Sequence, residues 1–287
     1  MVIASAMQPI WRFMVENNTQ LKEMIRSMVI DLLQGQKQEV ASSQPVKQAP
    51  RGQVEPGVFD TVDDAIQAAK AAQARFEDRT LATREKVIAD IRATMRPRVQ
   101  ELAQKTVEET GMGRVADKVL KLNLTLDKTP GVEDLVTECE TGDNGMTLYE
   151  LSAYGVIGAI TPSTNPAETL ICNTIGMLAA GNAVFFSVHP GAKHLSRLLV
   201  SELNQIIAKS IGIENLIVTL REPSIESAQE MMLHPDVSLL VVTGGPGVVK
   251  QALQSGKKVI GAGAGNPPAF VDATADMKKP AQDISLR

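Results

Sequence analysis

Apolar residues recur every three or four positions near the start of the chain, and they form short unbroken runs from residue 156 onward. The first pattern marks one face of a helix; its members are Leu21, Met24, Ile25, Met28, Val29, Leu32 and Leu33. The second pattern predicts buried strands, because short apolar runs suit a strand that is covered on both faces. The chain therefore divides into an amphipathic N-terminal helix and a later region of alternating strands and helices.

The amphipathic helix is predicted within residues 1–35, and Gly35 can end it. Residues 36–57 are rich in Gln, Ser, Pro and Gly and hold few large apolar side chains, which predicts a flexible linker. A helix that belongs to a core rarely needs a long polar connection, so its apolar face is expected to dock on a partner. Packing on its own domain, or against a second copy of itself, is the alternative that the pattern leaves open.

Further helices are predicted between Thr61 and Leu126. Thr61 is a suitable N-cap, and acidic residues at positions 63 and 64 favour the positive end of a helix. Residues 142–155 contain the turn sequence Asp-Asn-Gly between short extended segments, which predicts a β-hairpin.

Strands and helices are predicted to alternate through the rest of the chain. The strands expected are Val156–Ile160, Ala183–Ser187, Leu216–Leu220, Ser238–Thr243 and Lys258–Ile260. Helices of roughly a dozen residues between apolar strands give right-handed crossovers and a parallel sheet. The fold class expected is therefore α/β, with a Rossmann-like parallel-sheet cofactor domain over residues 58–287 and helices at its N-terminal side.

Composition narrows the class of protein. A net charge of −4 and an aromatic content of 3% disfavour a nucleic-acid partner. The longest apolar runs fall short of the ~20 residues that span a bilayer, so no membrane association is expected. Two cysteines form no framework of pairs, which favours the reducing cytoplasm. No His, Cys and Asp cluster has metal-ligand spacing, so no metal site is predicted.

Polar turns follow several of the predicted strands at their carboxyl ends, where open parallel sheets bind ligands. Thr161–Pro166 follows the first strand, and Ser187–Pro190 closes the second. Thr243–Gly247 follows a third strand and opens a helix, whose backbone amides attract phosphate. Each feature has a simpler interpretation: Asn165 can satisfy its own turn, His189 can be a surface residue, and glycines can serve only a tight connection.

The run Tyr154–Phe186 and the segment Gly261–Pro268, GAGAGNPP, together resemble the aldehyde dehydrogenase superfamily, most closely its CoA-acylating branch. The resemblance implies oxidation of acetaldehyde or propionaldehyde to acyl-CoA through a cysteine thioester, with NAD as cofactor and coenzyme A as co-substrate. It implies that Asn165 stabilises the oxyanion. The cofactor-binding residues that it implies are Thr161, Pro162, Ser163, Ser187, His189, Thr243, Gly244, Gly245 and Gly263.

Some positions depart from the family pattern. Ala262 stands where hydrolytic relatives carry a glutamate that activates water, and its absence favours a thiol acceptor such as CoA. Neither cysteine is a suitable catalytic nucleophile. Cys139 lies among acidic residues, whose charge raises the pKa of a thiol, and Cys172 has apolar sequence neighbours and is expected to be buried and unreactive. The family's cysteine falls beyond the point that matches residues 281–284. We therefore expect this chain to be truncated before the catalytic domain and inactive alone.

The amphipathic helix on its linker resembles the encapsulation peptides of bacterial microcompartment enzymes. This implies a location in the microcompartment lumen and a shell protein as partner; the docking residues are Leu21, Met24, Ile25, Met28, Val29 and Leu32. The hairpin at 142–155 corresponds to a subunit-bridging region, which implies a homo-oligomer. A non-catalytic shell-docking protein is the alternative function. A glutamyl-phosphate reductase, from another branch of the superfamily, is disfavoured by the tethered helix and the paired motifs.

Overall fold

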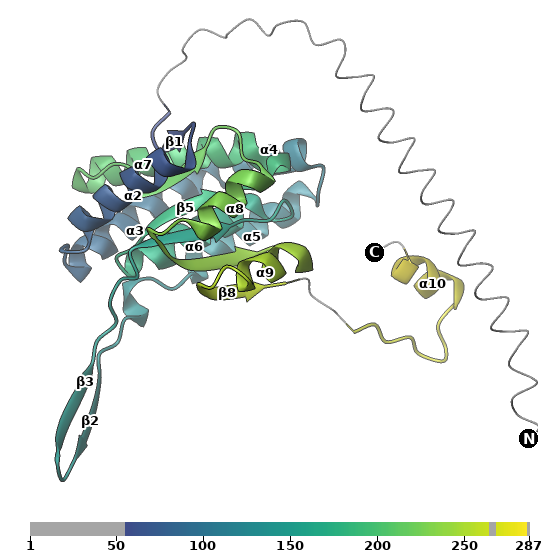
Figure 1. Ribbon diagram of the computed structural model, residues 1–287. Coiled ribbons are helices and arrows are strands. Elements are labelled where there is room, and N and C mark those ends of the chain that lie inside the picture. The colour runs from purple at the N-terminus through teal and green to yellow at the C-terminus, as the bar shows by residue number, and fades with distance from the viewer. Residues whose placement is uncertain (1–54, 264–267, 286–287) are drawn as a thin grey trace, which may run out of the picture. The chain divides into compact units, whose positions relative to one another are not determined.

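The computed structural model describes residues 55–263 and 268–285 of the 287 in the chain (Figure 1). The chain divides into two units, residues 1–53 and residues 54–287, and all described residues belong to the second. The amphipathic helix predicted within residues 1–35, and the linker up to residue 54, lie outside the described residues.

A parallel sheet forms the centre of the described unit. Its strand order is β1-β6-β5-β4-β7-β8, and every neighbouring pair is parallel. The strands are β1 (Val58–Phe59), β4 (Val156–Ile160), β5 (Ala183–Ser187), β6 (Ile217–Leu220), β7 (Val237–Thr243) and β8 (Lys258–Ala262). The predicted α/β class is confirmed, and β4 and β5 have the predicted bounds. The two-residue strand β1 was not predicted.

Helices cover both faces of this sheet. Helices α2 (Val62–Phe76) and α8 (Ile225–Leu233) pack against one face, while α6 (Pro166–Ala179) and α7 (Lys193–Ile211) pack against the other. Helix α9 (Pro246–Leu253) packs on β7 and β8. Helices α3 (Leu81–Met95), α4 (Val99–Thr110) and α5 (Val115–Lys128) form an outer layer over α6 and α7 (Figure 1). Short elements complete the chain: η2 (Arg96–Arg98), η3 (Val132–Asp134), η4 (Pro190–Ala192) and α10 (Lys278–Ser285).

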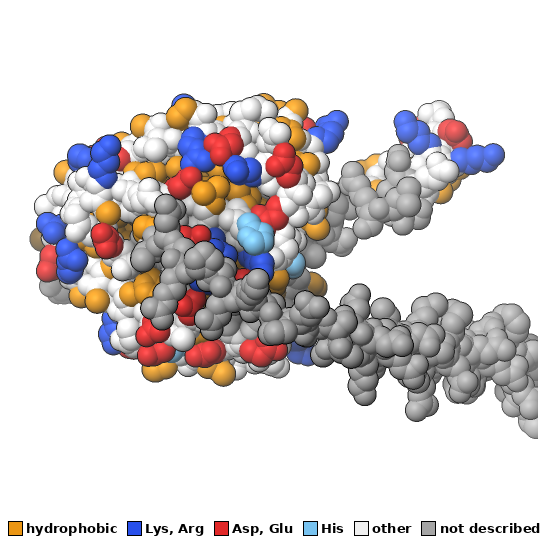
Figure 2. All heavy atoms as spheres, turned by 90° about the horizontal axis from the view of Figure 1, so that it is seen from above, with side chains coloured by type: hydrophobic (Ala, Val, Ile, Leu, Met, Phe, Trp, Pro, Cys, Tyr) orange, Lys and Arg blue, Asp and Glu red, His pale blue; other side chains and the backbone are white. Residues whose placement is uncertain are grey.

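Local chemistry explains where the first helices start. The Thr61 side chain accepts a hydrogen bond from the Asp64 backbone N–H at 3.2 Å, and Thr80 caps α3 in the same way. Strands β4, β5 and β6 are buried at every position, as the unbroken apolar runs predict. Outside this core, acidic and basic side chains are interspersed with apolar ones on the face seen in Figure 2.

The predicted hairpin at 142–155 is shifted toward the N-terminus. Its strands are β2 (Glu138–Gly142) and β3 (Gly145–Tyr149), joined at Asp143 and Asn144, and residues 150–155 are outside the strands. The turn needs Gly145, whose φ is +139°. Every residue of both strands is exposed. An isolated two-stranded hairpin is marginally stable in water, so this element needs a partner surface.

The end of the predicted linker is anchored, which corrects its boundary at residue 57. Glu55 accepts hydrogen bonds from Arg197 at 2.7 and 2.9 Å, and the Gly57 carbonyl accepts one from the Thr219 N–H at 2.8 Å. Gly57 is buried with φ +77°, and a Cβ there would lie 2.1 Å from Asn204 Nδ2. These contacts bind residues 55–57 to α7 and β6, so a linker can extend only to residue 54.

Candidate functional site

A cavity of about 580 Å³ opens at the carboxyl ends of the central strands. Its lining residues are Ile160, Thr161, Pro162, Ser163, Thr164, Ser187, Val188, His189, Pro190, Ser224, Ile225, Ala228, Thr243, Gly244, Gly245, Val248 and Gly263. All nine residues predicted to bind the cofactor are therefore brought together by the fold, from the last residues of β5 and β7 and from the loops that follow β4, β5, β7 and β8. This is the edge at which open α/β sheets bind ligands.

The loop after β4 supplies polar groups at the cavity floor. The Thr161 N–H donates to the Ser187 carbonyl at 3.2 Å, which ties the ends of β4 and β5 together. Thr161 is 2% exposed, and its Oγ1 has no hydrogen-bond partner within the described part of the chain. The Thr161 hydroxyl is therefore buried beneath the cavity surface. Ser163 and Thr164, which are less buried, are the other polar residues of this loop that line the cavity.

The glycine-rich turn after β7 presents the start of α9 to the cavity. The Gly244 N–H donates to the Ala262 carbonyl at 3.2 Å, and Gly245 occupies the N-cap position with Pro246 next. A Cβ at Gly245 would meet nothing within 4 Å, so the backbone here is open to an approaching ligand. Unpaired N–H groups at a helix start bind anions such as phosphate. This wall fits the phosphates of a dinucleotide.

His189 is exposed at the cavity rim, and its tautomer follows from one hydrogen bond. The Gly191 backbone N–H donates to His189 Nδ1 at 3.0 Å. Because Nδ1 is the acceptor, the neutral ring carries its proton on Nε2. Nε2 is therefore a donor, suited to a hydroxyl or phosphate oxygen. Ile225, Ala228 and Val248 also line the cavity and offer an apolar surface for a planar base.

Asn165 does not line this cavity; it follows the lining residue Thr164 at the start of α6. It is the N-cap residue of α6, yet its side chain makes no cap hydrogen bond. Its Oδ1 instead accepts hydrogen bonds from Lys118 Nζ at 3.0 Å and Lys121 Nζ at 3.2 Å, both on α5. The prediction from sequence did not include either lysine. One signal was present: Lys118 stands in the apolar stripe that Leu122 and Leu126 continue at i+4 and i+8.

The structure corrects the description of Cys172, which is exposed rather than buried. Its apolar sequence neighbours Ile171 and Ile175 are fully buried, while Cys172 lies with Gly176, one turn on, on the exposed strip of α6. There it borders a shallow hollow of about 410 Å³ with Met177 and Ile260 among its walls. Cys139 is exposed on the hairpin. Neither thiol lines the 580 Å³ cavity at the strand ends.

The remaining histidines differ from each other. His194 is exposed, whereas the side chain of His234 is only 12% exposed. His234 Nε2 lies 3.1 Å from Asp63 Oδ1, and its Nδ1 accepts from the Asp236 N–H at 3.2 Å. These bonds join the start of α2 to the turn before β7, which is a structural role. No group of side chains suited to a metal ion occurs among the described residues.

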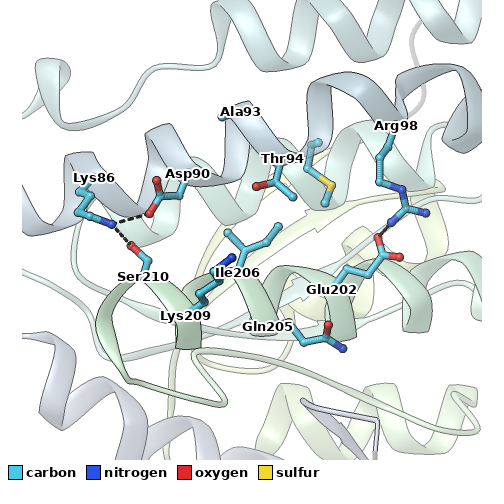
Figure 3. A pocket seen from close by; sticks show the side chains of 11 residues that line it. Lys86, Asp90, Ala93, Thr94, Arg98, Glu202, Gln205, Ile206, Lys209 and Ser210 are labelled. Atoms are coloured by element: carbon cyan, nitrogen blue, oxygen red, sulfur yellow. Dashed lines mark hydrogen bonds and ion pairs between the residues drawn. The ribbon is translucent and has the colours of Figure 1, made fainter.

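A second cavity, of about 600 Å³, lies between α3 and α7, away from the strand ends (Figure 3). Four of its five charged residues form two ion pairs. Lys86 donates to Asp90 at 2.7 Å and to Ser210 at 3.0 Å, and Arg98 is paired with Glu202. The hydrogen bond from Lys86 is the main reason that the pKa of Asp90 lies below its ordinary value. The Lys86–Ser210 hydrogen bond and the Arg98–Glu202 pair join α3 and η2 to α7, and Lys209 lines the cavity without taking part in either pair.

The parallel sheet, its crossover helices and the polar cavity at the strand ends define a Rossmann-like α/β protein. The sequence model described as aldehyde dehydrogenase family matches residues 32–286. The chain belongs to the aldehyde dehydrogenase family, as its motifs predicted. Within the described part of the chain, no helix has the length and apolar character needed to cross a bilayer.

Two curated relatives and one solved structure are close to this chain. It is 48% identical over 268 residues to the propanal dehydrogenase (CoA-propanoylating) of Salmonella typhimurium, covering 93% of this chain and 56% of the relative. It is 48% identical over 231 residues to the acetaldehyde dehydrogenase (acetylating) EutE of Escherichia coli, and this match covers 80% of this chain and 49% of the relative.

The structure of a propionaldehyde dehydrogenase from the Clostridium phytofermentans fucose utilisation bacterial microcompartment superposes with a TM-score of 0.74. It shares 51% identity, and the match covers 80% of this chain and 53% of that one. The chain thus spans about half the length of the relatives it matches.

Proposed function

We propose that this chain supplies the cofactor-binding part of a CoA-acylating aldehyde dehydrogenase that oxidises propionaldehyde or acetaldehyde with NAD and coenzyme A. The observation that carries the proposal is the convergence of nine predicted residues on one cavity at the strand ends. The printed names of two relatives with 48% identity, one CoA-propanoylating and one acetylating, support the choice of reaction.

The residues present fit a nicotinamide dinucleotide. The open backbone at Gly245 and the start of α9 would hold its phosphates. His189 Nε2 and the Ser187 hydroxyl are donors for ribose or phosphate oxygens. The bound cofactor supplies the acceptor for the hydride that leaves the aldehyde carbon. The apolar wall at Ile225, Ala228 and Val248 would exclude water from the adenine ring.

Asn165 would act on the aldehyde oxygen. When a thiol adds to an aldehyde, the carbonyl oxygen becomes an oxyanion, and the Asn165 Nδ2–H donates to it. A fixed donor of this kind contributes roughly 10²–10³ in rate. Ala262 ends β8 without a carboxylate that would activate water, which favours release of the acyl group to a thiol.

Cofactor binding tests the proposal directly. Isothermal titration of the purified 287-residue chain with NAD should show one site per chain, and a parallel titration with NADP measures the preference between the two. Absence of binding by either dinucleotide would overturn the proposal. Because neither Cys139 nor Cys172 lines the cavity, we expect no acyl-CoA from this chain with propionaldehyde, NAD and CoA. Appreciable acyl-CoA formation would refute that expectation.

We also propose that the amphipathic segment docks on a microcompartment shell protein. The segment lies outside the described residues, and its support is the apolar stripe that includes Ile25 and Leu32. Ile25→Glu or Leu32→Glu should abolish co-purification with shell proteins. Ser27→Glu introduces the same side chain on the opposite face of the predicted helix and should leave co-purification intact. Encapsulation retained by both apolar-face variants would exclude the docking role.

A shell-docking protein without catalysis is the second candidate function. It keeps the docking helix and the cofactor fold but lacks a nucleophilic cysteine, so it predicts shell binding with no acyl-CoA formation. The acyl-CoA assay tests the absence of catalysis, and the Ile25→Glu variant tests the docking that both candidates share.

A further inference from the structure

We propose that Lys118 and Lys121 are positioning residues that fix the orientation of the Asn165 side-chain amide, with Oδ1 held against α5 and Nδ2 left free as a donor. The inference rests on the proposed function, because it concerns the group assigned there to the oxyanion. It adds two residues of α5 that neither the motifs nor the cavity lining included.

The hydrogen bonds at Asn165 determine which end of the amide is available. An asparagine at a helix N-cap ordinarily uses Oδ1 to accept a backbone N–H of the first turn. Here Oδ1 accepts from two ammonium groups instead, at 3.0 Å from Lys118 and 3.2 Å from Lys121. Nδ2 forms no hydrogen bond with any described residue, so both of its protons are available to a ligand.

Electrostatics excludes the flipped amide. Rotating the amide by 180° would place the Nδ2 protons against two lysine ammonium groups, and lysine carries three donors and no acceptor. That arrangement would set positive hydrogens against positive charge and lose both hydrogen bonds. The two orientations of the Asn165 amide have nearly the same shape, and the lysines select the one with Oδ1 toward α5.

Lys118 is itself held firmly. It is only 3% exposed, and its ammonium contacts three oxygens: the Thr164 carbonyl, Asn165 Oδ1, and Glu168 Oε1 at 3.4 Å. It donates hydrogen bonds to the first two oxygens and forms an ion pair with the third. Glu168, on the first turn of α6, is 7% exposed and supplies the opposite charge that a buried ammonium needs.

The same lysine links Asn165 to the cofactor cavity. Lys118 binds the carbonyl of Thr164, and Thr164 lines that cavity. Two ammonium groups beside Oδ1 also polarise the amide and strengthen the Nδ2–H as a donor. The arrangement thus prepares a polarised donor at the edge of the site before any substrate binds.

The test is the nuclear magnetic resonance spectrum of the Asn165 amide in the full 287-residue chain. Its N–H₂ pair is assigned by its loss in Asn165→Asp. A hydrogen bond to the amide oxygen increases the double-bond character of the C–N bond and slows its rotation. Lys121→Met should therefore move the chemical shifts of the two Asn165 N–H₂ protons toward those of a solvated asparagine and accelerate rotation about the amide C–N bond. Lys118→Met should have the same effects more strongly. Lys118→Arg, which keeps a charged donor, should restore most of the wild-type spectrum.

Lys121 is exposed, so Lys121→Met is expected to fold even if Lys118→Met does not. A wild-type pair that already resembles a solvated asparagine would overturn the proposal. The proposal would also be overturned if the Asn165 N–H₂ signals of the folded Lys121→Met variant matched those of the wild type and one of two further results held. One is that the Lys118→Met signals are also unchanged; the other is that Lys118→Arg fails to restore the wild-type signals. The readout needs no cofactor, so failure here is distinct from failure of the proposed function, which the NAD titration decides.

Discussion

Gly245 allows the phosphate-binding role of the α9 start to be separated from its effect on stability. Replacing it by aspartate places a carboxylate at the N-cap of α9, on the wall of the proposed cofactor cavity. The backbone there has φ −69° and ψ 165°, which any residue adopts, and a Cβ meets nothing within 4 Å. The substitution therefore introduces a charge without strain or collision.

The two expected effects have opposite signs. An acidic N-cap stabilises a helix start relative to glycine by a few tenths of a kcal/mol. Against a phosphate at about 5 Å, one carboxylate in a solvated site with an effective dielectric constant of roughly 40–80 costs about 1–2 kcal/mol. At 1.4 kcal/mol per factor of ten, the dissociation constant for NAD should rise roughly 5- to 30-fold.

Titration calorimetry and thermal unfolding measure the two effects on the same samples. Gly245→Asn is the matched variant, because it has the shape and capping ability of aspartate without its charge. Gly247→Asp, two residues on and outside the cavity lining, controls for added negative charge. The loss of affinity in Gly245→Asp should shrink in 1 M salt, where the Debye length is about 3 Å. Equal NAD affinity in the aspartate and asparagine variants would refute phosphate binding at this helix start.

Further predictions concern packing, pH and thiol exposure. Gly158→Ala would set a Cβ 2.2 Å from Met231 Sδ, so urea unfolding should show a loss of about 1–3 kcal/mol, and an unchanged midpoint would contradict this packing. Hydrogen bonds from Lys70 and then Gln67 lower the pKa of Asp236, so its contribution is present above about pH 4 and is lost as the pH falls through the lowered value. The melting temperature of Asp236→Asn should therefore lie below wild type near neutrality and converge with it in acid; an equal difference at every pH would oppose this. In Cys139→Ser, the exposed Cys172 should react with a maleimide without denaturant, and a thiol protected until unfolding would indicate burial.

The central strands could be predicted because a buried parallel strand is apolar at every position. Val156–Ile160 and Ala183–Ser187 are such runs, and both occur with the predicted bounds. Strand β1 carries no such signal, since its two residues become a strand only by pairing with β6. The shifted hairpin has a similar cause: its turn residues are evident, but exposed strands lack the apolar alternation that marks where they end.

The side-chain environments were harder to predict. Cys172 has buried neighbours in sequence, yet a helix turns each residue by 100°, and the direction of that face depends on what packs against α6. Glu55 lies in a polar segment, and only the folded position of Arg197 shows that it is anchored. The candidate site is likewise only partly predictable from the sequence, because the motifs identified Asn165 but not Lys118 and Lys121, which bind its side chain.

The sequence by itself determined the alternation of strands and helices, the family, and the polar turns that follow β4, β5 and β7. These are properties of short segments, because burial and turn formation require particular residue types at particular spacings. The tertiary structure alone decided that nine of those residues share one cavity, that Asn165 stands just beyond it, and that Lys118 of α5 is buried against α6. Such contacts join segments far apart in the chain, and the free energy that selects them comes from packing and paired charge, which no single segment contains.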